Sequence, residues 1–206
     1  MTGHPSTPSE AAPDQTSDQT TVQTITDAKA LAALANPFRS RMLDALAVDG
    51  ASTASALAKR TGQAVGSASH HLKVLAEAGL VVEAPELARD RRERWWRLVA
   101  PARRWSRAEF ATDAGAVTAA LAAETVALQR QFERAQDWLA NSEGSGDWDE
   151  SAFATQIWLE LTPAELTELS KELIALTRRW LNRPTSDDGA EREPVFLFAR
   201  GFPAQP

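Results

Sequence analysis

Polar and apolar positions divide this chain into a polar start, a densely patterned middle and a more loosely patterned second half. Residues 1–24 are rich in Pro, Ser, Thr, Gln and Asp and contain almost no large apolar side chains. Such a segment cannot bury enough apolar surface to offset the entropy that it loses on ordering. We therefore expect residues 1–24 to be a disordered tail.

Between residues 25 and 100, the spacing of apolar positions predicts four helices and a hairpin. A short helix is expected to begin at Thr26, and Asn36 followed by Pro37 is typical of the start of a second helix. A third helix ends at Gly62, because glycine favours the backbone conformation that terminates helices. The fourth helix and the two strands of the hairpin are predicted at residues 64–78, 80–82 and 94–98.

This order of elements is typical of a winged helix-turn-helix. Three stretches, "LAALANPFRSRMLDAL", "SASHHLKVLAEAGLV" and "RRERWWRL", stand at the spacing of ArsR-type winged-helix transcriptional regulators, which residues 28–99 resemble. The resemblance implies a DNA-binding repressor. This sequence departs from that pattern at the wing tip, residues 86–90, which lacks the usual glycine. It also lacks the thiolate pair of the metal-sensing members, which implies a regulator that does not sense metals.

After Pro101 the pattern predicts one long helix, from about Arg103 to Asn141. Apolar positions recur every seven residues along it, at Ala114, Leu121, Leu128 and Ala135. A single small domain cannot cover so long a helix, so we expect a second copy of the chain to cover it. The sequence therefore predicts a homodimer whose interface is built on residues 101–143.

The last unit, residues 149–206, is predicted to be strand, helix, strand. Residues 156–161 alternate like a strand, Thr162 to Glu165 forms a capping box, and residues 194–199 read as a second strand. The fold class expected for the whole chain is mainly α with a small β component. It comprises the tail, a winged helix domain over 25–100, the dimerisation helix and this unit.

Composition narrows the possible chemistry. The 206 residues include no Cys and three His, so disulfides, thiolate metal sites and cysteine nucleophiles are excluded. Neither a secretory signal nor an apolar run long enough to cross a membrane is present, so we expect a soluble, cytoplasmic protein. The net charge is −6, but residues 37–98 hold ten basic and seven acidic residues, a local excess of three positive charges. A local basic patch is compatible with DNA binding in an acidic protein.

The fourth helix carries the main candidate site. At 100° per residue, Leu72 and Leu75 define its inner face and leave a polar outer face. We expect Ser67 and His70 to reach base edges in the major groove and Ser69 and Lys73 to contact phosphates. The alternative is a merely solvated helix face, which the surrounding helix-turn-helix pattern makes less favourable.

The hairpin and the paired histidines complete the DNA-binding prediction. Arg91, Arg92 and Arg94 of the wing are expected to contact phosphates or the minor groove, although an ordinary charged hairpin remains the alternative. His70 and His71 point about 100° apart on a helix and cannot chelate one metal ion together. By resemblance, His71 packs and forms hydrogen bonds within the domain. No metal site and no cofactor are expected.

The second half is rich in aromatic residues, and this suggests regulation. We predict an apolar small-molecule effector between the long helix and the last unit, whereas core and dimer packing is the simpler alternative. Two other functions remain open: a winged-helix module that binds protein instead of DNA, and a small enzyme. No nucleophile motif or phosphate loop is present, so we expect no enzyme. The predicted effector-binding residues are Trp105, Phe110, Phe132, Trp138 and Trp158.

Overall fold

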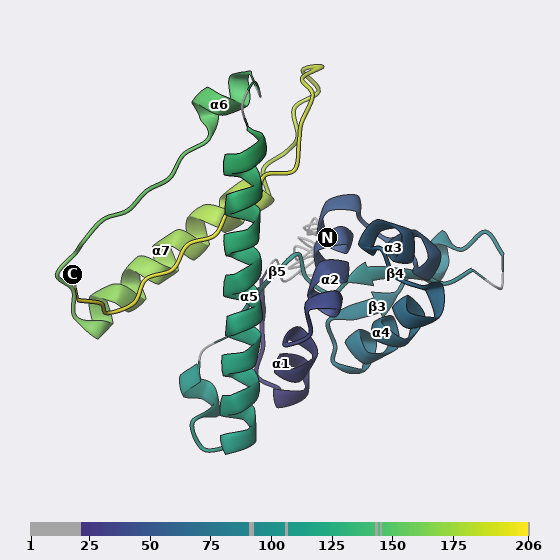
Figure 1. The fold of residues 1–206 in the computed structure, drawn as a ribbon, viewed down its shortest axis with the longest axis horizontal. Coiled ribbons are helices and arrows are strands. Elements are labelled where there is room, and N and C mark those ends of the chain that lie inside the picture. Colours follow the sequence, from purple (N-terminus) through teal and green to yellow (C-terminus); the bar gives the residue numbers. More distant parts are fainter. Residues whose placement is uncertain (1–21, 91–92, 106, 143, 145, 206) are drawn as a thin grey trace, which may run out of the picture.

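The computed structural model describes residues 22–90, 93–105, 107–142, 144 and 146–205. Figure 1 shows a helical N-terminal domain with a small sheet, a long helix beside it, and a C-terminal arm on the far side of that helix. The predicted fold class is confirmed, since helices dominate and a winged helix-turn-helix is followed by a long helix. The first domain contains α1 Ala28–Leu34, α2 Pro37–Asp49, β2 Ser52–Thr53, α3 Ala54–Thr61, α4 Val65–Glu77, β3 Val81–Glu83 and β4 Trp95–Leu98.

The helices of this domain begin and end at the residues that local chemistry favours. Asn36 caps α2 by accepting hydrogen bonds from the N–H groups of Phe38 and Arg39, at 3.0 and 3.1 Å, with Pro37 at the first helical position. Thr53 caps α3 in the same way, and Gly62 ends α3 with φ of +67°. The first helix is capped by Asp27 and not by Thr26 as the sequence suggested, because the Asp27 carboxylate accepts from the Lys29 N–H.

One apolar core holds these helices together. Seven of its large side chains are fully enclosed, and burial of each is worth roughly 1.5–3 kcal/mol relative to exposure. They come from α1, α2, α3, α4 and the turn before β3, so the helix-turn-helix is rigidly supported from behind. These side chains are Leu31, Met42, Leu43, Leu57, Leu72, Leu75 and Leu80.

The wing is a three-stranded antiparallel sheet in the order β2-β4-β3. Trp96 of β4 is 5% exposed and joins the core, so it anchors the hairpin to the helices. Near the tip, a single turn of 3-10 helix spans Pro85–Leu87. The Arg89 N–H then donates to the Glu93 carboxylate at 3.0 Å and lowers the pKa of Glu93. This bond links Arg89 and Glu93, which flank residues 91 and 92 outside the described part of the chain.

A strand that the sequence did not predict joins the two ends of the domain. β1 Val22–Thr24 pairs in parallel with β5 Ala102–Arg104, and the neighbouring Ile25 is 2% exposed. The prediction of a disordered tail over residues 1–24 is therefore wrong for its last three residues. They form a strand because the chain returns after the wing and places β5 beside them. Residues 1–21 lie outside the described residues.

The long helix is shorter than predicted. The region before it holds the end of β5 Ala102–Arg104 and a 3-10 turn at Arg107–Phe110. The helix α5 spans Ala114–Asn141, and Asp113 caps it by accepting hydrogen bonds from the N–H groups of Gly115 and Ala116. Pairing of β5 with β1 holds residues 102–104 in an extended conformation, and this tertiary contact overrides the helical pattern that residues 103 and 104 show in the sequence. Its 28 residues give α5 a length of about 42 Å.

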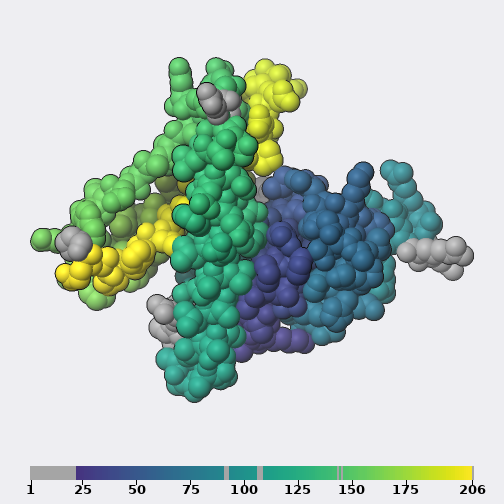
Figure 2. Space-filling view, in the orientation of Figure 1, coloured from purple at the N-terminus to yellow at the C-terminus, as the bar shows by residue number. Residues whose placement is uncertain are grey.

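α5 is fastened to the N-terminal domain at two levels. It packs along α1 (Figure 1 and Figure 2), and its small residues Ala116, Ala120 and Ala123 are buried. Further along, the Asp44 carboxylate of α2 accepts hydrogen bonds from both Arg130 and Arg134. Burial lowers the pKa of Arg130 to about 10, with repulsion from Arg134 acting in the same direction. The guanidinium still stays charged at neutral pH.

The C-terminal unit contains its predicted helix but not its predicted strands. α7 Pro163–Leu181 begins with the complete Thr162/Glu165 capping box, after a short α6 Asp147–Ser151. Residues 156–161 and 194–199 belong to no strand within the described residues, so the prediction of two strands is wrong for this single chain. An alternating segment becomes a strand only when a neighbouring segment completes its hydrogen bonds, and neither segment has such a neighbour here.

Candidate nucleic-acid interface

The exposed face of α4 is a narrow stripe. Gly66, His70, Lys73 and Glu77 are all exposed and recur at intervals of four, three and four residues, so at 100° per residue they lie within about 60° of one another. The two predicted serines, Ser67 and Ser69, are half-buried on either side of this stripe. The structure thus places His70 and Lys73 on the exposed stripe and the two predicted serines at its flanks.

The opposite face of α4 holds the helix in place. Ala68, Leu72 and Leu75 are each 0% exposed. At the N-terminus, Ala64 offers no side chain to cap the helix, so the first N–H groups stay available to an outside acceptor. Gly66 adds no side chain there, and open space surrounds the place that a Cβ would occupy. A phosphate group suits such a helix start, since N–H dipoles and the helix dipole both favour an anion.

Charges near α4 are arranged unevenly along its length. Glu77, at the far end, forms an ion pair with Lys29 of α1 at 3.5 Å. Lys73 forms no ion pair with any residue that the structure describes, so its charge is free to meet a phosphate. The outer stripe of α4 therefore offers one positive charge that no described residue pairs, at Lys73, one turn before the paired Glu77.

His71 lies on the inner side of the stripe and plays a packing role. Its ring stacks on that of Phe38 with centroids 6.2 Å apart and planes 13° from parallel. Burial lowers the pKa of His71, and the nearby charges of Arg39 and His70 lower it further. The predicted hydrogen bonding is not found at Nδ1, which is buried without a hydrogen-bond partner among the described residues.

In the wing, the side chain of Arg94 is 62% exposed. One of its guanidinium nitrogens lies 3.7 Å from the carboxylate of Glu83 in β3. Arg97 forms a similar contact with Glu86 at 3.8 Å. Exposed ion pairs of this kind contribute only about 0–1 kcal/mol, so a phosphate competes with them readily. Arg91 and Arg92 lie outside the described residues.

Two exposed residues that the sequence did not single out lie in the first turn of α4 or in the helix before it. Val65, in the first turn of α4, is 49% exposed, and an exposed aliphatic group there suits contact with a thymine methyl. Lys59, near the end of α3, is exposed one short turn before α4 begins. In the sequence, Lys59 could have been noticed as half of a basic pair with Arg60 at the end of a predicted helix.

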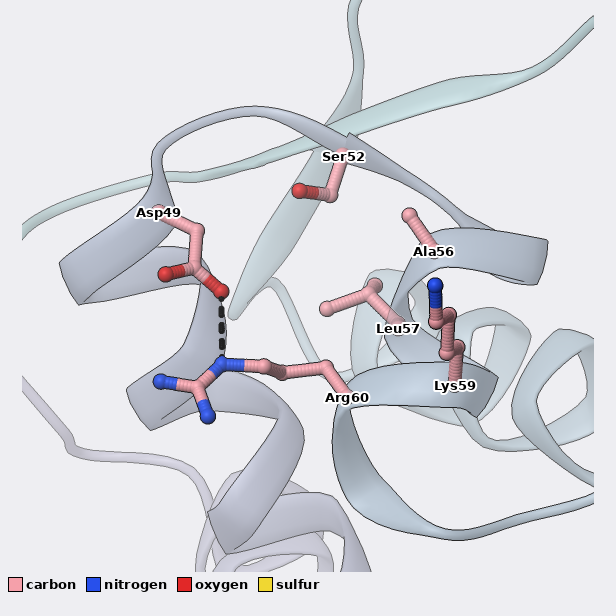
Figure 3. Close-up of a pocket in the computed structure, with 6 residues that line it drawn as sticks. All are labelled: Asp49, Ser52, Ala56, Leu57, Lys59 and Arg60. Carbon is pink, nitrogen blue, oxygen red and sulfur yellow. Dashed lines mark hydrogen bonds and ion pairs between the residues drawn. The ribbon is translucent and has the colours of Figure 1, made fainter.

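The predicted effector-binding aromatic residues do not gather in one place. Phe110 is 5% exposed in the core and Trp105 packs against that core, whereas Phe132, Trp138 and Trp158 are 40–60% exposed. A described pocket of about 440 Å³ lies elsewhere, between the end of α2 and α3 (Figure 3). There Arg60 donates to Asp49 at 3.0 Å, and none of the five aromatic residues lines it. The lining residues are Asp49, Ser52, Ala56, Leu57, Lys59 and Arg60.

The part of the chain that the structure describes contains no group of three or more His, Cys, Asp or Glu residues placed to hold a metal ion. Over the same residues, no helix combines the length and apolar character needed to span a bilayer.

Comparison with known proteins agrees with this geometry. Residues 34–84 match the family model of a helix-turn-helix domain, which covers α2, α3, α4 and β3. The chain carries a helix-turn-helix domain. Together with the β2-β4-β3 wing, this confirms the winged helix-turn-helix that the ArsR-type resemblance implied. The second helix of a helix-turn-helix motif is the one that reads the major groove in DNA-binding domains, and α4 holds that position in this chain.

One similar solved structure is a homodimeric winged helix-turn-helix DNA-binding domain from Mycobacterium bovis, described as a possible ArsR-family transcriptional regulator. It is 24% identical to this chain, and the match covers 55% of this chain and 82% of that one with a TM-score of 0.34. A likeness at this level carries no argument about function. No curated protein matches the chain.

Proposed function

We propose that this protein is a sequence-specific DNA-binding transcriptional regulator that acts as a homodimer and represses its target genes. The observation that carries the proposal is the exposed stripe of α4, which belongs to a helix-turn-helix, presents His70 and Lys73 and begins at an uncapped helix start. His70, together with Ser67 and Val65, reads base edges, whereas Ser69 and Lys73 contact phosphates. The wing arginines Arg91, Arg92 and Arg94 follow the backbone or enter the minor groove.

The homodimer is supported by the exposed side of α5. Leu121, Leu128, Phe132 and Leu139 are 52–78% exposed and fall within about 40° of one another around the helix. Such an apolar stripe along a helix is the pattern of a helix-to-helix seam. Two copies joined along it would present two α4 helices to successive major grooves, about 34–36 Å apart.

Repression and release belong to the same proposal. Repression follows from the ArsR-type resemblance, and release by an apolar small molecule follows from the exposed aromatic residues Phe132, Trp138 and Trp158, which lie on α5 and in the arm beyond it. Screening apolar compounds by tryptophan fluorescence, in parallel with release of bound DNA, tests this part. Fluorescence shifts that occur without any change in DNA binding would contradict it.

The experiment for the proposed function is selection of fragments from random or genomic DNA by the purified full chain, followed by salt titration of the best fragment. We expect one enriched motif with twofold symmetry and an affinity that falls steeply with salt, since phosphate contacts release counterions. The alternative function is a module that binds protein through the same surface. Absence of any enriched motif, with an affinity that salt leaves unchanged, would favour that alternative.

A further inference from the structure

The C-terminal arm, residues 144–205, has no core of its own. Ala123 is the last buried residue among those that the structure describes, and none of the described residues from 144 to 205 is buried. The arm nevertheless carries many large apolar side chains that are 37–78% exposed. They are Trp148, Phe153, Ile157, Trp158, Leu159, Leu161, Leu173, Leu176, Trp180, Leu181, Val195, Phe196, Leu197, Phe198 and Phe202.

The backbone of the arm is arranged as an unfinished β-α-β unit. Residues 152–162 and the tail 194–205 run in the same direction, and α7, which connects them along the chain, runs the opposite way (Figure 1). A parallel pair of strands joined by a helix is a standard unit, but these two extended segments pair neither with each other nor with another described segment. Their N–H and C=O groups therefore form open edges, which readily accept another strand.

The side chains of both segments suit strands of a sheet that is covered on at least one side. Alternation places Ile157, Leu159 and Leu161 on one face of the first segment, and Val195 and Leu197 on one face of the second. The opposite face of the second segment carries Phe196 and Phe198, whereas that of the first carries Trp158 between the polar Gln156 and Glu160. Apolar residues on both faces, as in the second segment, are typical of strands in buried sheets, whereas alternation, as in the first, is typical of strands with one buried face.

We propose that each extended segment pairs with a segment of a second copy of this chain, so that two arms complete one intermolecular sheet covered by both α7 helices. The aliphatic faces of the segments meet the Leu173 and Leu176 side of α7, and the aromatic faces turn toward α5. This inference rests on the homodimer of the proposed function, because a dimer joined along α5 brings two unfinished arms together at high local concentration.

Three observations favour a second copy as the partner. The exposed aromatic surface of one arm alone is on the order of 600–1,000 Å², which is comparable with the roughly 800 Å² that a stable interface buries on each partner. The tail is held beside α5, where Arg134 lies 4.9 Å over the ring of Phe196 and Arg200 donates to Gln131 at 2.8 Å. The arm is therefore held against α5, the helix that carries the proposed dimer seam.

The third observation is charge. Glu160 is the one charged residue in segments 156–161 and 194–199, so two copies approach each other without opposing rows of like charge. Unpaired edges of identical strands are also complementary to one another across a twofold axis. DNA is a poor partner for this surface, which is apolar and carries no excess of positive charge.

Disulfide trapping tests the proposal on the full chain, because the natural sequence contains no cysteine. The variants are L159C and L197C, each alone and mixed with the other, with V48C as the matched control. Leu159, Leu197 and Val48 are 52%, 57% and 48% exposed, and Val48 lies on α2, away from the arm. After mild oxidation we expect at least one arm variant or mixture to form a covalent dimer at least about tenfold faster than V48C, because paired strands bring Cβ atoms within roughly 4.5–5.5 Å.

Hydrogen exchange gives a second measurement that does not depend on cysteine geometry. Amides of residues 157–161 and 195–199 should be protected in the wild-type dimer, and L197D should lose this protection in both segments. Equal trapping for every variant and control would overturn the proposal. So would rapid exchange of both segments in a confirmed dimer, or a double variant L159C/L197C that closes within one chain. Trapping in a protein that binds no DNA would overturn the proposed function and leave the intermolecular sheet standing.

Discussion

Lys73 provides the sharpest test of the DNA-binding surface. Its side chain is exposed on the outer stripe of α4 and pairs with no described acidic residue, so it offers one phosphate contact in each protomer and two in a dimer. Each contact contributes about 0.9 to the slope of log K against log salt. The variant K73A should therefore make the slope shallower by about 1.8.

The same relation sets the loss of affinity. We take the free energy of each phosphate contact to come from counterion release alone, which falls to zero near 1 M salt. Loss of both contacts in K73A should then weaken DNA binding about 30-fold at 0.15 M salt and about 200-fold at 0.05 M. The loss should be similar for operator and unrelated DNA, because a phosphate contact carries no sequence information. By contrast, H70A should mainly reduce the preference for the operator.

Fluorescence anisotropy with a labelled operator, recorded at four salt concentrations, measures both quantities. The matched control is K171A, which removes an exposed lysine of α7 that is paired with Glu168 at 3.0 Å and lies outside the winged helix. K171A should leave slope and affinity unchanged. If K73A and K171A gave the same slope as the wild type, α4 would not lie against phosphates.

Three further predictions concern stability and assembly. The variant D44N leaves Arg130 and Arg134 without their shared carboxylate, so the free energy of unfolding in urea should fall by about 2–3 kcal/mol, and a loss under about 0.5 would contradict the α2–α5 link. Burial lowers the pKa of His71, so just below pH 6.5 the unfolded chain binds more protons than the folded chain does. The contribution of His71 to the free energy of unfolding should therefore be constant above that pH and decline below it, and H71F should reduce the difference between urea midpoints measured at pH 5 and pH 8. The variant L128D should weaken the dimer about thousandfold in sedimentation equilibrium, at about 2 kcal/mol for each of the two Leu128 side chains; an unchanged dissociation constant would exclude the α5 stripe as the seam.

The sequence by itself determined the winged helix-turn-helix. Asn36 with Pro37, Gly62 and the apolar spacing of α4 are local signals, and each acts within a few residues of the helix that it begins, ends or orients. The outer face of α4 followed from the same periodicity, so His70 and Lys73 could be placed without coordinates. The Thr162/Glu165 capping box of α7 was predictable for the same local reason.

Tertiary structure decided what depends on distant parts of the chain. β1 exists because residues 102–104 return beside residues 22–24, and that pairing in turn delays the start of α5. Phe110 enters the core while Phe132 stays on the surface, a difference that helical spacing alone could not distinguish. The alternation in 156–161 and 194–199 correctly signalled apolar faces but not strands, because a strand exists only where a second segment completes its hydrogen bonds.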